Sequence, residues 1–203
     1  MLPGGSLTGT INGNGGGDFL DYSTRNTPVI VNLATGQATD IGGVQDVNNV
    51  LGSASGGDML TGNAAGGVLI GHNGNNTLRA GSGRSILIGG AGKNTLLGGP
   101  ADDIIIDGRT AYDGNFLALK YLLSTWQTAS SFSPRLSTLQ NTANTYFLVA
   151  DNTVFAGARR LASTLVGNGG RNWFFAINIS NIVDFHAATD FWTPYWWGAY
   201  VWF

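Results

Sequence analysis

The chain has 203 residues, a formal net charge of −2, 32 glycines and no cysteine. Only 11% of its residues are charged, which argues against a nucleic-acid partner, and the lack of cysteine excludes disulfides, thiolate metal sites and a cysteine nucleophile. Hydrophobic residues reach 43%, too many for a disordered linker, and glycine has no three-residue period, so we expect a packed fold with many tight turns rather than collagen.

The N-terminal stretch MLPGGSLTGTINGNGGG has neither the basic region nor the apolar region of a signal peptide. No apolar run reaches the roughly 18 residues needed to cross a bilayer, so we expect no transmembrane segment. A glycine-rich turn followed by apolar residues, GNGGGDFLD, occupies Gly13–Asp21. Strands are expected after it, near Val29–Leu33 and Val44–Leu51.

A regular repeat runs from Ser53 to Ile106. It divides without a gap into six blocks of nine residues: SASGGDMLT, GNAAGGVLI, GHNGNNTLR, AGSGRSILI, GGAGKNTLL and GGPADDIII. The eighth residue of every block is aliphatic: Leu60, Leu69, Leu78, Leu87, Leu96 and Ile105. A register kept without insertions indicates a repeat architecture.

Each block combines one turn with one short strand. Gly and Asn in its first half accept the positive φ of tight turns, and its last three residues point the aliphatic eighth residue inward. Two blocks make one coil, and stacked coils make two parallel sheets around the aliphatic ladder. The sequence therefore predicts a mainly β fold, a parallel β-roll (β-solenoid) of nonapeptide repeats, with the regular array 53–106 inside a glycine-rich roll at 1–110.

The blocks resemble the hemolysin-type, or RTX, calcium-binding nonapeptide G-G-x-G-x-D-x-U-x. GGAGKNTLL, GGPADDIII and GNGGGDFLD are the nearest to it, and the resemblance covers about half of the chain. It implies a secreted, extracellular bacterial protein, exported without an N-terminal signal peptide. It also implies calcium bound between turns two blocks apart, by the Asp of the sixth column together with backbone carbonyls.

The sixth column departs from the family pattern, because it reads Asp58, Gly67, Asn76, Ser85, Asn94 and Asp103. Alternate blocks share a side of the roll, so each turn offers at most one carboxylate, whereas calcium takes several oxygen ligands. Either these turns have lost calcium and Asn amides join loop to loop, or one to three weak sites survive. In the second case the resemblance implies ligands among Asp18, Asp58, Asn76, Asn94 and Asp103.

The seventh and ninth residues of each block flank the inward residue and face outward. In alternate blocks both are β-branched aliphatics, which would form an apolar patch prone to association if exposed to water: Val68, Ile70, Ile86, Ile88, Ile104 and Ile106. The segment Asn115–Ala129 has no Gly or Pro and carries an apolar stripe at helical spacing. We expect it to form a helix that covers this face, anchored by Leu122 and Trp126, followed by a short helix from Ser133-Pro134 to Gln140.

The C-terminal part, 111–203, is expected to be a mixed α/β cap. It passes through a degenerate stretch around Arg159 and Arg160 and rejoins the roll through a late repeat copy, GNGGRNWFF, at Gly167–Phe175. The final DFWTPYWWGAYVWF is rich in aromatic residues, which suits packing on the last coil or, alternatively, docking of a partner or a membrane interface.

No catalytic constellation is found. His72 lies in a repeat turn, where we expect it to be exposed, and His186 has no second His at metal-binding spacing. We therefore expect a non-enzymatic calcium-binding structural or secretion module, with a larger exoprotein or a cell-surface molecule as its partner. The alternative is an adhesion or protein-interaction module that uses its aliphatic or aromatic surface without metal. Ice binding and polysaccharide degradation are disfavoured, since the third column lacks Thr and the carboxylates are not clustered.

Overall fold

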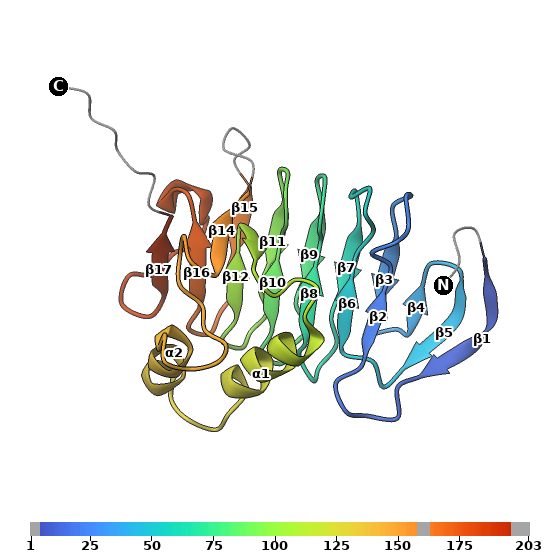
Figure 1. Cartoon of the computed structure of the whole chain (residues 1–203), viewed down its shortest axis with the longest axis horizontal. Coiled ribbons are helices and arrows are strands. Elements are labelled where there is room, and N and C mark those ends of the chain that lie inside the picture. The colour runs from blue at the N-terminus through green and yellow to red at the C-terminus, as the bar shows by residue number, and fades with distance from the viewer. Residues whose placement is uncertain (1–4, 158–162, 196–203) are drawn as a thin grey trace.

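The computed structural model describes residues 5–157 and 163–195, and it shows a roll of short strands in two facing sheets (Figure 1). The first sheet has the strand order β1 (Leu7–Asn12), β5 (Ile41–Gln45), β4 (Gln37–Ala38), β3 (Ile30–Asn32), β7 (Met59–Thr61), β9 (Thr77–Arg79), β11 (Thr95–Leu97) and β15 (Thr164–Val166). The second has the order β17 (Phe191–Pro194), β16 (Trp173–Ala176), β12 (Ile104–Ile106), β10 (Ile86–Ile88), β8 (Val68–Ile70), β6 (Asn49–Leu51) and β2 (Phe19–Asp21). Strand pairing along the repeat array is parallel, which confirms the predicted β-roll.

The eighth residue of each block faces the interior between the sheets. These residues pair in register along each sheet, for example Leu78 with Leu96 and Leu87 with Ile105. None of the six is more than 1% exposed, and all belong to the buried cluster that forms the inner core of the roll: Leu60, Leu69, Leu78, Leu87, Leu96 and Ile105. The predicted aliphatic ladder is confirmed, and each coil buries its aliphatic residue only against its neighbours.

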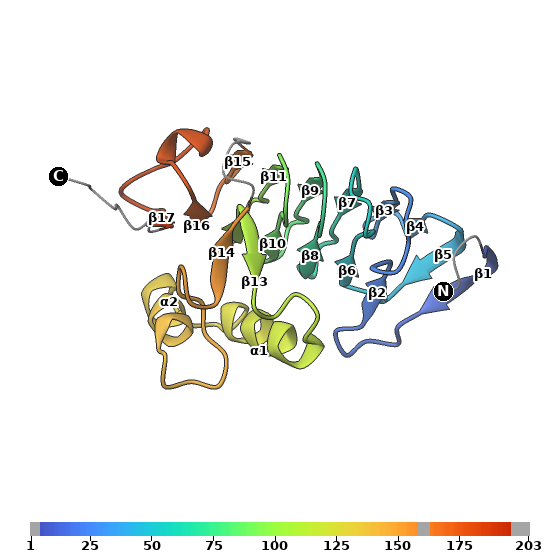
Figure 2. The same cartoon turned by 45° about the horizontal axis from the view of Figure 1, so that its top comes forward.

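The chain leaves the roll after β12 and returns to it at β15 and β16. The excursion contains the antiparallel pair β13 (Gly108–Thr110) and β14 (Val154–Ala156), and the helices α1 (Phe116–Trp126) and α2 (Phe132–Gln140). Both helices lie on the side of the second sheet (Figures 1 and 2). The late copy brings β16 beside β12, and a 3-10 turn at Ile179–Asn181 leads on to β17. The division of the chain into a roll at 1–110 and a cap at 111–203 stays a prediction.

Helix α1 covers the aliphatic outer face of the second sheet, as the alternation of the blocks predicts. A single buried cluster contains the six aliphatic residues of that face and four residues of α1: Val68, Ile70, Ile86, Ile88, Ile104 and Ile106 with Leu119, Leu122, Leu123 and Trp126. Asn115 begins the helix by accepting a hydrogen bond from the Ala118 amide at 3.1 Å. Leu122 and Trp126 are at most 1% exposed, so both expected anchors are in place.

A buried arginine fixes the two helices to the turns of the roll. The Arg135 guanidinium pairs with Asp102, donates to the Trp126 carbonyl at 3.0 Å and lies 4.4 Å from the centre of the Trp126 ring. The Trp126 indole N–H in turn donates to the Asp102 carbonyl at 2.8 Å. Asp102 occupies the fifth column of the last block, so the end of the repeat array is one docking point of the helices.

The region expected as one strand near Val44–Leu51 is two strands in different sheets, and that expectation was wrong. Asp46 adopts a positive φ of 53°, which breaks the strand and lets the chain cross from β5 in the first sheet to β6 in the second. The strand expected at Val29–Leu33 is the shorter β3. Part of the aromatic C-terminus forms β17 on the last coil, where Trp192 packs against the inner core. Arg159, Arg160 and residues 196–203 lie outside the described residues.

Candidate metal turns of the roll

The sixth-column side chains on the first-sheet side form a continuous stack. Asp58, Asn76 and Asn94 are each at most 2% exposed. Each backbone N–H donates to the side-chain oxygen one coil later: Asp58 N–H to Asn76 Oδ1 at 3.0 Å, and Asn76 N–H to Asn94 Oδ1 at 2.9 Å. Three of the predicted site residues are therefore brought together, in a ladder that satisfies buried backbone donors.

The second-sheet side carries an equivalent ladder, which contains Asp103. Gly67 N–H donates to Ser85 Oγ at 3.3 Å, and Ser85 N–H donates to Asp103 Oδ1 at 2.6 Å. Asp103 N–H then donates to Asn172 Oδ1 at 3.0 Å. Asn172 N–H donates to Asp190 Oδ1 at 2.8 Å.

Sequence reasoning missed Ser163, which ends the first ladder, and Asp190, which ends the second. Asn94 N–H donates to Ser163 Oγ at 3.0 Å. The two helices lie between these residues in the sequence, so the nine-residue period does not indicate that they pair. Asp190 belongs to a turn, DFHAATD, that has no glycine. Its spacing of 18 residues from Asn172 is the signal that would have found it.

Turns with Asp in the sixth column (Asp turns) differ from turns with Asn there (Asn turns) in the hydrogen bonds of the other terminal side-chain atom, Oδ2 of Asp or Nδ2 of Asn. Asp58 Oδ2 accepts from Ser53 N–H at 2.7 Å, and Asp103 Oδ2 accepts from Gly99 N–H at 2.7 Å. Asn76 Nδ2 instead donates to the carbonyls of its own turn, with Gly71 O and Asn73 O both at 2.9 Å. Asp turns thus aim N–H groups inward, whereas Asn turns aim carbonyl oxygens inward.

Burial governs the electrostatics of the Asp103 turn. Desolvation raises the pKa of Asp103 to about 7, although hydrogen bonds from Gly99 and Ser85 favour its charged form and act in the opposite direction. The nearby charge of Asp102 raises the pKa further. Without a bound cation, this carboxylate is held in a site that disfavours its charge.

Asp18 lies apart from the array, in the first glycine-rich turn, and it best fits a cation. Its Oδ2 is a buried atom with no hydrogen-bond partner in the described residues. A Cβ placed on Gly13 would lie 3.0 Å from that oxygen and 2.4 Å from the Asp46 carbonyl oxygen, so both oxygens crowd one spot that only glycine leaves open. Oxygen atoms of this kind are calcium ligands. The ligand roles of Asp18, Asp58, Asn76, Asn94 and Asp103 stay predictions.

The described residues contain no group of three or more His, Cys, Asp or Glu that could hold a metal. Calcium at any of these turns would therefore depend on backbone carbonyls. Within the same residues, none of the helices is both long enough and apolar enough to cross a membrane.

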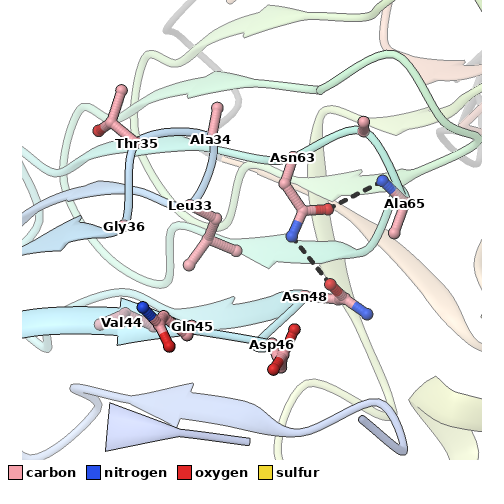
Figure 3. Close-up of a pocket in the computed structure, with 11 residues that line it drawn as sticks. Leu33, Ala34, Thr35, Gly36, Val44, Gln45, Asp46, Asn48, Asn63 and Ala65 are labelled. Carbon is pink, nitrogen blue, oxygen red and sulfur yellow. Dashed lines mark hydrogen bonds between the residues drawn. The ribbon is translucent and has the colours of Figure 1, made fainter. Parts of the chain in front are cut away.

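A hollow of about 630 Å³ lies between the turn after β3 and the turn after β7 (Figure 3). Its polar groups bond to one another: Asn63 Nδ2 donates to Asn48 Oδ1 at 2.8 Å, and Asn63 Oδ1 accepts from Ala65 N–H at 3.0 Å. Among its described lining residues, Asp46 carries the one carboxylate and none is basic. This arrangement gives no acid–base pair to a bound molecule.

A smaller hollow of about 400 Å³ brings His72, Arg109 and Asp113 together. His72 is half-buried rather than exposed, contrary to the expectation from its place in a turn, because the excursion after β12 lies against it. Its Nε2 is buried without a partner among the described atoms. Burial raises the pKa of Asp113, whose Oδ1 accepts from the Thr110 hydroxyl at 2.6 Å.

Stacked turn-and-strand units of nine residues, joined coil to coil by sixth-column side chains, define a β-solenoid repeat protein. Residues 70–105 match the family model of the RTX calcium-binding nonapeptide repeat in four copies. This segment therefore carries RTX repeats, as the sequence pattern indicates, and the repeat family implies calcium binding. Searches of curated proteins and of solved structures found no match to the chain.

Proposed function

We propose that the chain is a non-enzymatic structural module of an extracellular protein, and that its roll binds calcium weakly at a few carboxylate-bearing turns. The observation that carries the proposal is the buried Oδ2 of Asp18, which has no hydrogen-bond partner among the described residues and lies beside the Asp46 carbonyl. A buried anionic oxygen without a donor is costly, and a cation at that spot would remove the cost.

Weak affinity follows from the ligand count. Asp58 already accepts three hydrogen bonds, from Val29 N–H, Ser53 N–H and the Ser53 hydroxyl, so it has little capacity left for a metal. Asp103 accepts two and has no second carboxylate stacked with it in the array. Calcium sites of extracellular modules typically have dissociation constants of about 10⁻⁴–10⁻³ M, and a site with one carboxylate belongs at the weak end.

The extracellular setting and the non-enzymatic role rest on the repeats. RTX repeats are typical of secreted proteins, and in them the repeats act as structural, calcium-binding units. A larger exoprotein or a cell-surface molecule would be the partner of such a module. The hydrogen-bonded lining of the hollow beside Asn63 is in keeping with a structural role.

The alternative, an adhesion module without metal, is favoured by a different surface from the one that the sequence suggested. The aliphatic face of the second sheet is buried under α1 and cannot meet a partner. The outer face of the first sheet presents Ile30 and Met59 side by side, 62% and 54% exposed. Two adjacent exposed side chains make a small apolar patch of the kind that weak contacts use.

Calorimetric titration with calcium tests the proposal. We expect the wild-type chain to bind one or two ions at about 10⁻³ M, and Asp18→Asn to lose one of them. Asp21→Asn is the matched control, because Asp21 is exposed and its one described side-chain hydrogen bond, from Ser23 N–H to Oδ1, survives in Asn. Absence of binding in the wild type would overturn the proposal in favour of the metal-free alternative, and equal binding by Asp18→Asn would remove Asp18 from it.

A further inference from the structure

The amide nitrogen of Asn76 lies among converging carbonyl oxygens. Besides Gly71 O and Asn73 O at 2.9 Å, it has Gly74 O and Gly89 O at 3.3 Å. Gly89 belongs to the following coil, so the four oxygens come from two adjacent turns. Carbonyl oxygens that converge from neighbouring turns provide the environment that a bound cation requires. Here an N–H₂ group occupies that position.

Other Asn turns of the roll follow the same pattern. Asn94 Nδ2 donates to Gly90 O at 3.4 Å and to Gly92 O at 3.3 Å. Asn172 Nδ2 donates to Gly169 O at 2.8 Å. The Asn76 amide lies close against the backbone of its turn: a Cβ on Gly71 would lie 2.6 Å from Asn76 Nδ2. A cation could not share this position with the amide group.

The Asp turns show that the side chain determines whether backbone N–H groups or carbonyl groups point toward it. Asp58 and Asp103 draw N–H groups to the oxygen that corresponds to Asn Nδ2, whereas Asn76 draws carbonyls. A carboxylate at position 76 with the same backbone would place a negative oxygen against four carbonyl oxygens. Such a site is stable only when a cation lies between the oxygens or when the turn is rebuilt.

We propose that the amide groups of Asn76 and Asn94 take the place of a bound cation in the first-sheet turns, so that these turns are ordered without metal. Both residues then have a role different from the ligand role that the sequence implies. The proposal deepens the proposed function, because it limits calcium to the Asp-bearing turns. It also makes a gain-of-function prediction: Asn→Asp should convert a metal-independent turn into a calcium-dependent one.

The test compares the double variant Asn76→Asp/Asn94→Asp with the wild-type chain, in a chelator and in calcium at about 10 mM, well above the ~10⁻³ M expected of weak sites. The measurement is the thermal unfolding midpoint by circular dichroism. In chelator the double variant should melt well below the wild type, and calcium should narrow the gap by about 5 °C or more. Asn75→Asp is the control for added charge: it adds one of the two charges, in the turn of Asn76, and its one described side-chain hydrogen bond, from Lys93 N–H to Oδ1, survives in Asp. It should melt with the wild type in both solutions.

Three results would overturn the proposal: a wild-type chain that loses its β spectrum in chelator, a double variant as stable in chelator as the Asn75→Asp control, or a double variant that calcium does not rescue. If the double variant fails to fold in chelator, the single variant Asn94→Asp gives a milder test, since its amide contacts two carbonyls at 3.3–3.4 Å. Failure of the wild type to bind calcium would leave this proposal standing and overturn only the one based on Asp18.

Discussion

Covering the second sheet with α1 should be a major source of stability, and Ile88→Asp tests it. Ile88 is 1% exposed and pairs with Ile70 on one side and Ile106 on the other, beneath the helix. Losing a fully buried Ile side chain costs about 2–3 kcal/mol of transfer free energy. The carboxyl group that replaces it would lie in an apolar cluster. Burying a polar group without a hydrogen-bond partner costs about 1–3 kcal/mol more. The free energy of unfolding should therefore fall by about 4–5 kcal/mol.

Thr77→Asp is the control, because it places the same residue on the outer face of the first sheet, which the helices do not cover. Its effect should stay within about 1 kcal/mol. Urea denaturation followed by circular dichroism and tryptophan fluorescence measures both, and a difference of about 4 kcal/mol corresponds to roughly 10 °C in the thermal midpoint of a chain of this size. Similar losses in the two variants would refute the covering role of α1.

Three further outcomes are expected. Burial raises the pKa of Asp103 to about 7, above the ~3.9 of an unfolded Asp. The contribution of Asp103 to stability is therefore complete below about pH 4 and is lost as the pH rises to about 7. In urea titrations from pH 4 to 8, the free energy of unfolding of Asp103→Asn should decline less steeply than that of the wild type. Arg135→Ala should cost about 3 kcal/mol by leaving Asp102 and the Trp126 carbonyl without their buried partner, and an unchanged denaturation midpoint would contradict this. Gly90→Ala should lower the thermal midpoint strongly, because Gly90 has φ +83° and a Cβ there would lie 1.7 Å from the His72 carbonyl oxygen; a wild-type midpoint would show that the turn can be rebuilt.

The parts of the fold that sequence could predict are those that the nine-residue period controls. Leu78 and Leu87 occupy equivalent positions in adjacent blocks, so one rule places both in the interior. The aliphatic outer face followed from the same period, because it alternates with Thr77 and its equivalents. Outside the periodic array the prediction failed, as at Asp46, whose left-handed backbone sends the chain from one sheet to the other.

The candidate site could be predicted only to the level of residue type. The sixth column identified Asp58 and Asn76 as neighbours on one side, and the hydrogen bond between them agrees. The column could not show whether a turn aims N–H groups or carbonyls at the side chain, because that depends on the backbone dihedrals of each turn. Nor could it show the contact of Asn94 with Ser163, because pairing across the excursion depends on how the helices pack.

The hydrogen-bond ladders cross the excursion without losing register. Asn94 reaches Ser163, and Asp103 reaches Asn172, across 69 residues, where other steps span 18. The helical segment is therefore an insertion within a single coil, and strands β11 and β15, which flank it in the first sheet, pair directly with each other. A scaffold of this kind can gain, exchange or enlarge one covering segment while every other coil keeps its neighbours. The boundary of the excursion, between Asp107 and Ser163, is where another segment with closely spaced ends could replace it, provided that this segment also covers the aliphatic face that α1 buries.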